Sequence, residues 1–93
     1  MVIMKTIQIV KKKTMEQEQD ERKDKGVIIM KAGKVMRVDG LHDVFIVRSE
    51  NNDNILYTVE NDTCTCPDFQ RRQYYCKHMY ATKYYIALCE ESV

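Results

Sequence analysis

Three cysteines and one histidine lie close together in the C-terminal third of this 93-residue chain. Cys64 and Cys66 are separated by one residue, and Cys76 and His78 repeat that spacing after nine intervening residues. Side chains at i and i+2 point in different directions on a helix but share one face of an extended chain. Pro67 also disfavours helical backbone at Cys66. We therefore predict that both thiols of the first pair face one ion from the end of a strand.

The second pair is expected to work differently. An apolar helical pattern begins near His78, so Cys76 should lie in the turn before a helix and His78 in its first turn. Three thiolates and one imidazole complete a tetrahedral shell of the kind that holds structural zinc. Magnesium and calcium prefer oxygen ligands. We predict one structural Zn²⁺, with the metal ligands Cys64, Cys66, Cys76 and His78.

Two other uses of these cysteines are less favoured. A bridge between Cys64 and Cys66 would close a strained ring, and clustered thiols in a reducing compartment usually bind metal. A cysteine nucleophile needs a nearby general base, and none is indicated beyond these four residues. The closed ligand shell also leaves no position for water. We expect no catalytic residue, no enzymatic activity and no small-molecule substrate.

The elements that must position this cluster follow from the rest of the chain. Residues 1–13 are interpreted as an N-terminal arm or strand, with a short basic run at its end. Residues 14–33 are interpreted as a polar helix, which begins at a capping box of Thr14 and Gln17 and ends at Gly33. Residues 16–25 carry no apolar side chain, so this half should project into solvent; a disordered polar segment is the alternative.

Alternating apolar residues follow Gly33. They predict strands at Lys34–Val38, Val44–Arg48 and Ile55–Glu60, with a two-residue turn at Asp39 and Gly40. The chain is thus predicted to form one small α+β domain, with an N-terminal helix, a three-stranded antiparallel sheet and a zinc-bound C-terminal helix. Residues 34–93 are taken as the zinc-finger domain.

The cluster and its neighbours resemble the SWIM-type zinc finger, whose pattern is Cys-x-Cys, a spacer and Cys-x-His. The resemblance rests on Cys66-Pro67-Asp68-Phe69, on Cys76-Lys77-His78 and on Gly33-Lys34-Val35 before the strands. It covers about residues 26–88 and implies a ββα-like zinc unit beside a small sheet, with a short helical turn at Asp68. The family includes transposases, chromatin-remodelling ATPases, partners of recombinases and short stand-alone archaeal and bacterial proteins. This chain looks like a small stand-alone member. The resemblance implies binding to DNA or to other proteins.

Two surfaces are candidates for a partner. Residues 69–86 contain cations and tyrosines but no acid, a composition that suits binding to a nucleic-acid backbone. The candidate nucleic-acid-binding residues are Arg71, Arg72, Lys77 and Lys83. These cations could instead offset the negative charge of the zinc thiolates.

On a helical wheel of the C-terminal helix, one face is expected to pack on the sheet; it consists of Ala81, Tyr84, Tyr85 and Leu88. Met79 and Ile86 fall opposite, where they would be covered by the N-terminal helix or exposed to a partner or second copy.

The overall charge is nearly balanced, with 15 Lys and Arg against 14 Asp and Glu, so only the distribution of charge carries information. No targeting signal or membrane-spanning stretch is evident, and a cytoplasmic location is expected. The leading prediction is a DNA-binding or regulatory zinc protein. The alternative is a protein-interaction adaptor or homodimer without a role in nucleic-acid binding.

Overall fold

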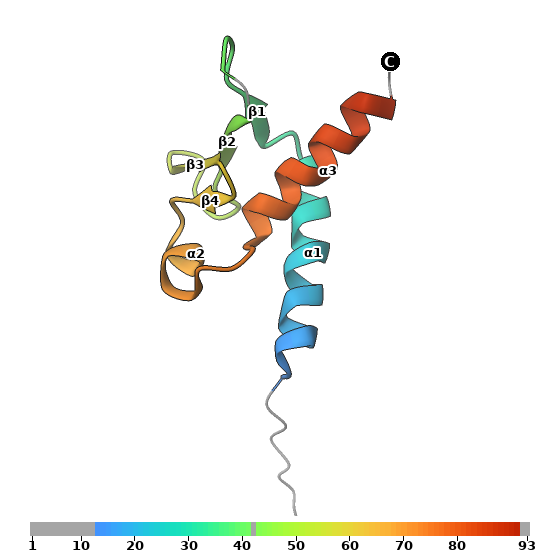
Figure 1. The fold of residues 1–93 in the computed structure, drawn as a ribbon, viewed down its shortest axis with the longest axis vertical. Coiled ribbons are helices and arrows are strands. Elements are labelled where there is room, and N and C mark those ends of the chain that lie inside the picture. Colours follow the sequence, from blue (N-terminus) through green and yellow to red (C-terminus); the bar gives the residue numbers. More distant parts are fainter. Residues whose placement is uncertain (1–12, 42, 92–93) are drawn as a thin grey trace, which may run out of the picture.

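The computed structural model describes residues 13–41 and 43–91, so nearly all of the predicted N-terminal arm lies outside the described residues. Three helices and four strands follow one another along the chain (Figure 1). In order they are α1 (Met15–Lys31), β1 (Val35–Arg37), β2 (Val44–Arg48), β3 (Leu56–Glu60), β4 (Thr63–Cys64), α2 (Pro67–Arg72) and α3 (Lys77–Glu91). The predicted α+β class is confirmed.

The four strands form one antiparallel sheet in the order β1-β2-β3-β4. Val47 in β2 lies opposite both Val35 in β1 and Tyr57 in β3. The predicted sheet lacked β4, whose two residues are too short to give an alternating pattern. This strand matters for the site, because it places Cys64 beside Val59 in β3.

The connection between β1 and β2 differs from the predicted two-residue turn. Asp39 and Gly40 do form a turn, closed by a hydrogen bond from the Leu41 N–H to the Val38 carbonyl. The strand pairing, however, resumes only at Val44. The loop is longer than Asp39 and Gly40 alone, and Asp43, directly before β2, has a left-handed backbone conformation with φ of 60°.

Helix α1 begins and ends with the predicted signals. The Thr14 hydroxyl accepts from the Gln17 N–H at 3.0 Å, and the Gln17 amide accepts from the Thr14 N–H at 2.9 Å. At the other end Gly33 has φ of 74°, and the N–H groups of Gly33 and Lys34 donate to the Met30 and Ile29 carbonyls. This pair of backbone hydrogen bonds is the Schellman motif. Glycine is favoured at its left-handed position because it has no Cβ.

The polar half of α1 is mostly exposed, as predicted, but two of its side chains contact the rest of the domain, which the sequence prediction did not include. Gln19 donates to the Tyr75 carbonyl at 2.8 Å and to the Tyr80 hydroxyl at 3.1 Å. Arg22 forms two hydrogen bonds to the Asp68 carboxylate at 2.9 and 3.1 Å. Polar side chains, rather than apolar ones, therefore attach this half of the helix to the rest of the domain.

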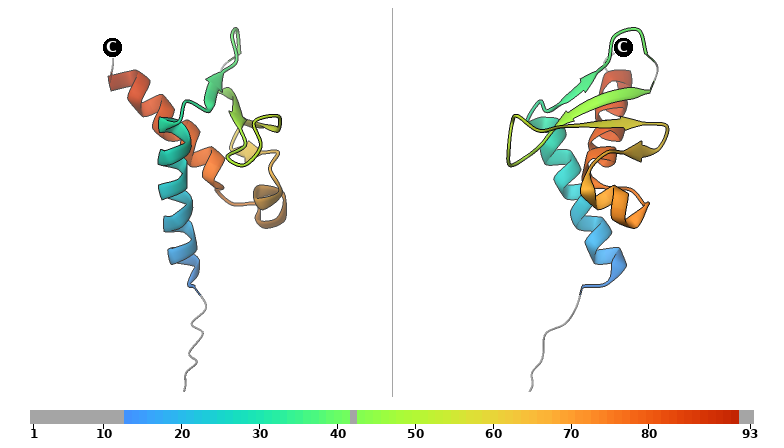
Figure 2. Two further views of the ribbon diagram at one scale, coloured as in Figure 1. Left: turned by 180° about the vertical axis from the view of Figure 1, so that it is seen from behind. Right: turned by 90° about the vertical axis from the view of Figure 1, so that its left-hand side faces the viewer.

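Helix α3 lies between α1 and the sheet and contacts both (Figures 1 and 2). The side that faces α1 includes Tyr80 and Ala81, which lie against Gly26 of α1. The side that faces the sheet includes Met79, which is only 2% exposed, and Ile86, which packs against the core. The predicted wheel thus recognised two faces of α3 but assigned Ala81 and Met79 to the wrong neighbours.

The core lies between the sheet and α3 and continues into the cysteine cluster. Its apolar members are Ile29, Val35, Phe45, Val47, Val59, Phe69, Met79 and Ala81, joined by Cys64, Cys66 and Cys76. In the part of the chain that the structure describes, no helix has the length and apolar character needed to cross a membrane.

Candidate metal centre

Each predicted ligand sits at the end or start of a secondary-structure element. Cys64 ends β4, and Cys66 is the N-cap of α2, with the first helical position occupied by Pro67. Proline is favoured there because its fixed φ suits the helix and its missing N–H would have no partner. Cys76 directly precedes α3 and His78 is the second residue of that helix. These placements agree with the local structure expected from the sequence.

The structure brings the four side chains together in a buried cluster. Their ligand atoms all lie within 4.8 Å of one another, and all four residues are buried. The His78 Nδ1 atom is 3.9 Å from the sulfur atoms of both Cys64 and Cys76. Ligand atoms around tetrahedral zinc lie roughly 3.5–3.8 Å apart. The cluster therefore fits an ion of this size with little movement.

The orientation of the His78 ring supports the same conclusion. Nδ1 faces the sulfur atoms, while Nε2 is buried and has no hydrogen-bond partner among the described residues. The Tyr57 ring packs on the imidazole with a centroid separation of 4.6 Å. A metal bound at Nδ1 requires the neutral imidazole with its proton on Nε2. When zinc is bound, it would be held by three sulfurs and this nitrogen and would supply a structural cross-link.

The three thiols interact strongly with one another. The pKa of Cys64 is raised well above its usual range, because its thiol is hydrogen-bonded to Cys66 and Cys76 and is buried. The pKa of Cys66 is lowered far below its usual range, because Cys64 and Cys76 stabilise its thiolate. For Cys76, the bond with Cys64 lowers the pKa, but Cys66 and burial outweigh it and raise the pKa to about 11. Zinc must therefore displace protons from this cluster when it binds.

A second layer of contacts holds the ligands in place. The Phe69 N–H donates to the Cys66 sulfur at 3.4 Å, as expected for an N-cap. The Gln70 amide donates to the Cys64 carbonyl at 2.8 Å, which ties α2 to β4. Such contacts fix the orientation of metal ligands, and losing one typically costs roughly 10–100-fold in metal affinity.

Asp68 connects this centre to α1, and sequence reasoning gave it no such role. Its carboxylate accepts paired hydrogen bonds from Arg22 in α1 and from Arg72 in α2, at 2.9–3.1 Å. These two guanidinium groups lower the pKa of Asp68 well below its usual range. Asp68 and Arg22 are 46 residues apart, so no local sequence pattern could have paired them.

Of the predicted nucleic-acid-binding cations, the structure brings Arg71, Arg72 and Lys77 to one groove and leaves Lys83 outside it. Arg72 is engaged with Asp68, and Lys77 forms a 2.6 Å ion pair with Glu50. Arg71 contacts Asp68 only at 3.7 Å, and its side chain is 77% exposed. Lys83 lies elsewhere, with its ammonium 5.0 Å from the centre of the Tyr75 ring.

Most of the tyrosines interleaved with these cations are used internally. Tyr75, Tyr80 and Tyr84 form a continuous series of ring contacts, and Tyr85 packs edge-on against Phe45. Tyr74 stands out because it is 57% exposed.

The comparison with known proteins agrees with this geometry. Residues 51–87 match the family model of the SWIM zinc finger. This segment contains all four ligands, together with β3, β4, α2 and most of α3. The chain contains a SWIM zinc finger. No match to the chain was found among curated proteins or among solved structures.

The SWIM zinc finger is thus joined to elements outside the matched segment. Helix α1, β1 and β2 all precede residue 51. Arg22, Gln19 and Gly26 attach α1 to the finger, and the pairing of β2 with β3 extends its sheet. The finger and these additional elements share one core.

Proposed function

We propose that this protein is a nucleic-acid-binding module, in which one structural zinc ion holds a basic groove in shape. The groove has a volume of about 410 Å³ and lies between α1 and α2. Six cationic and three acidic residues line it, which gives a net charge of +3. The lining residues are Lys13, Glu18, Glu21, Arg22, Lys25, Asp68, Arg71, Arg72 and Lys77. This local excess of positive charge carries the proposal, because phosphate contacts dominate nucleic-acid affinity.

The cations of the groove divide into two groups. Arg22 and Arg72 are held by Asp68, so they shape the groove rather than bind ligand. Lys25 has no ion pair among the described residues, and Arg71 has only the 3.7 Å contact to Asp68. Lys13 pairs with Glu21 at 2.6 Å, but both side chains are about half exposed. Exposed ion pairs contribute little stability, so Lys13 can leave Glu21 to contact a phosphate. We propose that Lys13, Lys25 and Arg71 contact phosphates.

Tyr74 offers a surface for a base. It follows α2 closely in the chain, and more than half of its side chain is exposed. Stacking of bases on aromatic rings adds affinity for single strands with little sequence preference. We therefore propose that single-stranded nucleic acid binds at least as well as duplex.

The proposal is tested by titrating the zinc-loaded protein with labelled single-stranded and duplex DNA at several salt concentrations. Three phosphate contacts predict that log K falls with log salt at a slope of about −2 for single strands and about −3 for duplex. Arg71→Ala and Lys25→Ala should each make this slope shallower by roughly one contact.

Lys31→Ala is the matched control, since it removes one exposed cation from the far end of α1. It should leave the slope nearly unchanged. Absence of binding to either DNA at low salt, with zinc bound and the fold intact, would contradict the proposal and favour the adaptor alternative.

The homodimer alternative is weakened by the placement of Met79. This residue was expected on an exposed strip with Ile86, but it is 2% exposed. Both residues instead line a groove between α3 and the sheet.

A further inference from the structure

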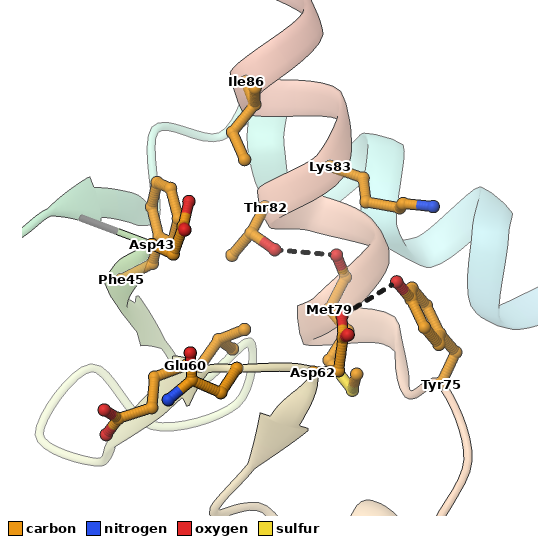
Figure 3. Close-up of a pocket in the computed structure, with 11 residues that line it drawn as sticks. Asp43, Phe45, Glu60, Asp62, Tyr75, Met79, Thr82, Lys83 and Ile86 are labelled. Atoms are coloured by element: carbon orange, nitrogen blue, oxygen red, sulfur yellow. Dashed lines mark hydrogen bonds between the residues drawn. The ribbon is translucent and has the colours of Figure 1, made fainter.

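A second groove lies on the side of α3 that faces away from the basic groove. It has a volume of about 370 Å³ and opens between α3 and the strands. Its apolar lining consists of Phe45, Val59, Met79 and Ile86. Figure 3 shows Ile86 and Thr82 on α3 facing Phe45 across the opening. The Thr82 hydroxyl donates to the Met79 carbonyl at 2.8 Å, so it needs no ligand and leaves the interior mainly apolar.

The rim of this groove is acidic. Asp43, Glu60 and Asp62 line it, against one cation, Lys83, which gives a net charge of −2. Asp43 and Glu60 form no ion pair among the described residues, and the Asp62 carboxylate accepts only from the Tyr75 hydroxyl at 3.4 Å. Elsewhere in the described chain, acids such as Glu50 and Asp68 are paired with cations. The rim therefore carries negative charge that the domain does not neutralise itself.

Lys83 does little to compensate these acids. Its ammonium lies over the Tyr75 ring rather than against a carboxylate. In Figure 3 its side chain extends away from Asp43. The part of the rim formed by Asp43 and Asp62 is thus free to receive a cation from outside.

The backbone fixes two of these acids at the rim. Asp43 has φ of 60° and Asp62 has φ of 62°. Aspartate and asparagine tolerate this left-handed conformation better than most residues. Asp62 is further held in the tight connection between β3 and β4, where the Thr63 hydroxyl donates to the Glu60 carbonyl at 2.6 Å. The backbone conformation at Asp43 and Asp62 therefore helps to hold both carboxylates at the rim.

We propose that this acidic groove binds a short peptide segment of a partner protein, in which an apolar side chain is flanked by lysine or arginine. The apolar side chain would lie between Phe45 and Ile86, and the flanking cations would pair with Asp43 and Asp62. The argument is one of charge and shape complementarity. A polyanion is repelled by the rim, and a purely apolar segment leaves the acids unpaired. This interaction is additional to nucleic-acid binding, because the two grooves lie on different faces of α3.

The test uses a labelled hexapeptide of alternating lysine and leucine with blocked ends, titrated into the zinc-loaded protein and followed by fluorescence anisotropy. We expect saturable binding at low salt. Peptides in which glutamate replaces lysine, or serine replaces leucine, should bind at least tenfold more weakly. Methyl resonances of Met79 and Ile86 should shift on addition of the lysine–leucine peptide, which locates it in the groove.

A charge-neutral variant provides the decisive comparison. Asp43→Asn, Glu60→Gln and Asp62→Asn together remove the three rim charges, while asparagine retains the left-handed conformation. Binding should weaken about tenfold, whereas the matched triple variant Glu16→Gln, Asp24→Asn and Glu90→Gln should stay within twofold of the wild type. Equal weakening in both variants, or methyl shifts confined to other residues, would overturn the proposal. So would the absence of binding at millimolar peptide.

Discussion

Cys66 serves two structural purposes through one atom. Its sulfur belongs to the metal cluster and also accepts the hydrogen bond that begins α2. An N-cap satisfies a backbone donor that otherwise lacks a partner, and an anionic cap interacts favourably with the helix dipole. Zinc keeps this sulfur in the thiolate form. Metal binding and the start of α2 are therefore coupled at a single residue.

The first prediction concerns the identity of the ligands. Cys64→Ser should abolish stoichiometric zinc binding and unfold the domain, because structural sites contribute on the order of 10 kcal/mol to folding. Cys89→Ser is the control, since Cys89 lies in α3 outside the cluster. It should retain the zinc content of the wild type, measured by elemental analysis of purified protein. Equal zinc content in both variants would show that the cluster is not the site.

The second prediction concerns pH. Raised pKa values at Cys64 and Cys76 mean that these thiols hold protons near neutral pH, and zinc must displace them. Affinity should therefore fall as the pH falls, by about a hundredfold per unit if two protons are released. Competition with a chromophoric chelator at pH 6.5 and 7.5, corrected for the protonation of the chelator, measures this change. A pH-independent affinity would mean that the metal-free cluster is already deprotonated.

At the scale of single residues, the sequence predicted the four side chains that the structure brings together in the buried cluster. The spacing of Cys64 and Cys66, the proline after them and the start of an apolar helix near His78 are all local signals. The contacts of Asp68 and Gln19 between α1 and the finger were not predicted, because their partners lie 46 and 56 residues away in the chain. Contacts of that separation depend on how the elements pack, and a single sequence does not show this.

Among the elements, the crossing of α1 and α3 depends on one glycine. A Cβ at Gly26 would lie 2.7 Å from the Tyr80 Cβ and 3.0 Å from the Ala81 nitrogen. The Ala81 nitrogen is a backbone atom of α3, and the Tyr80 Cβ is bonded directly to that backbone, so neither atom can move away by a side-chain rotation. The two helices can approach this closely only because position 26 has no side chain.

The third prediction follows from this contact. Gly26→Ala should destabilise the zinc-loaded protein by about 1–3 kcal/mol through overpacking, despite a gain of up to about 1 kcal/mol in helix propensity. Urea denaturation followed by circular dichroism measures the difference. Lys23→Ala, on the exposed surface of α1, is the control and should change stability by less than about 0.5 kcal/mol. A Gly26→Ala variant as stable as the wild type would show that the helices lie further apart.

The elements show where sequence patterns succeed and where they fail. The ends of α1 and the position of β2 were predicted correctly, because Thr14, Gln17, Gly33 and the alternating residues act locally. Strand β4 was missed because two residues carry no periodicity. The wheel separated two faces of α3 but does not say which neighbour takes each: Tyr85 packs on Phe45 of the sheet as predicted, whereas Ala81 faces α1 and Met79 faces the sheet.

Considered as a whole, the molecule separates its charges. The chain has 15 Lys and Arg and 14 Asp and Glu, yet these charges are unevenly distributed on the surface. One side of α3 has a groove of net charge +3, and the other side has a groove of net charge −2. Sequence counts indicated only that residues 69–86 lack acids. The basic groove draws two of its six cations, Arg22 and Lys25, from α1, and the acidic rim comes from the β1–β2 loop, the end of β3 and the turn after it, so folding creates both.

This separation of charge gives the domain a permanent electric dipole although its net charge is close to zero. A dipole experiences a torque in the field of a polyanion before any contact is made. Under the proposed function, this torque turns the α1–α2 side of the domain towards a nucleic-acid strand and leaves the opposite groove facing the solvent. If both proposed contacts form, a domain oriented in this way bridges a strand and a basic protein segment, and raised salt weakens the orientation and both contacts together.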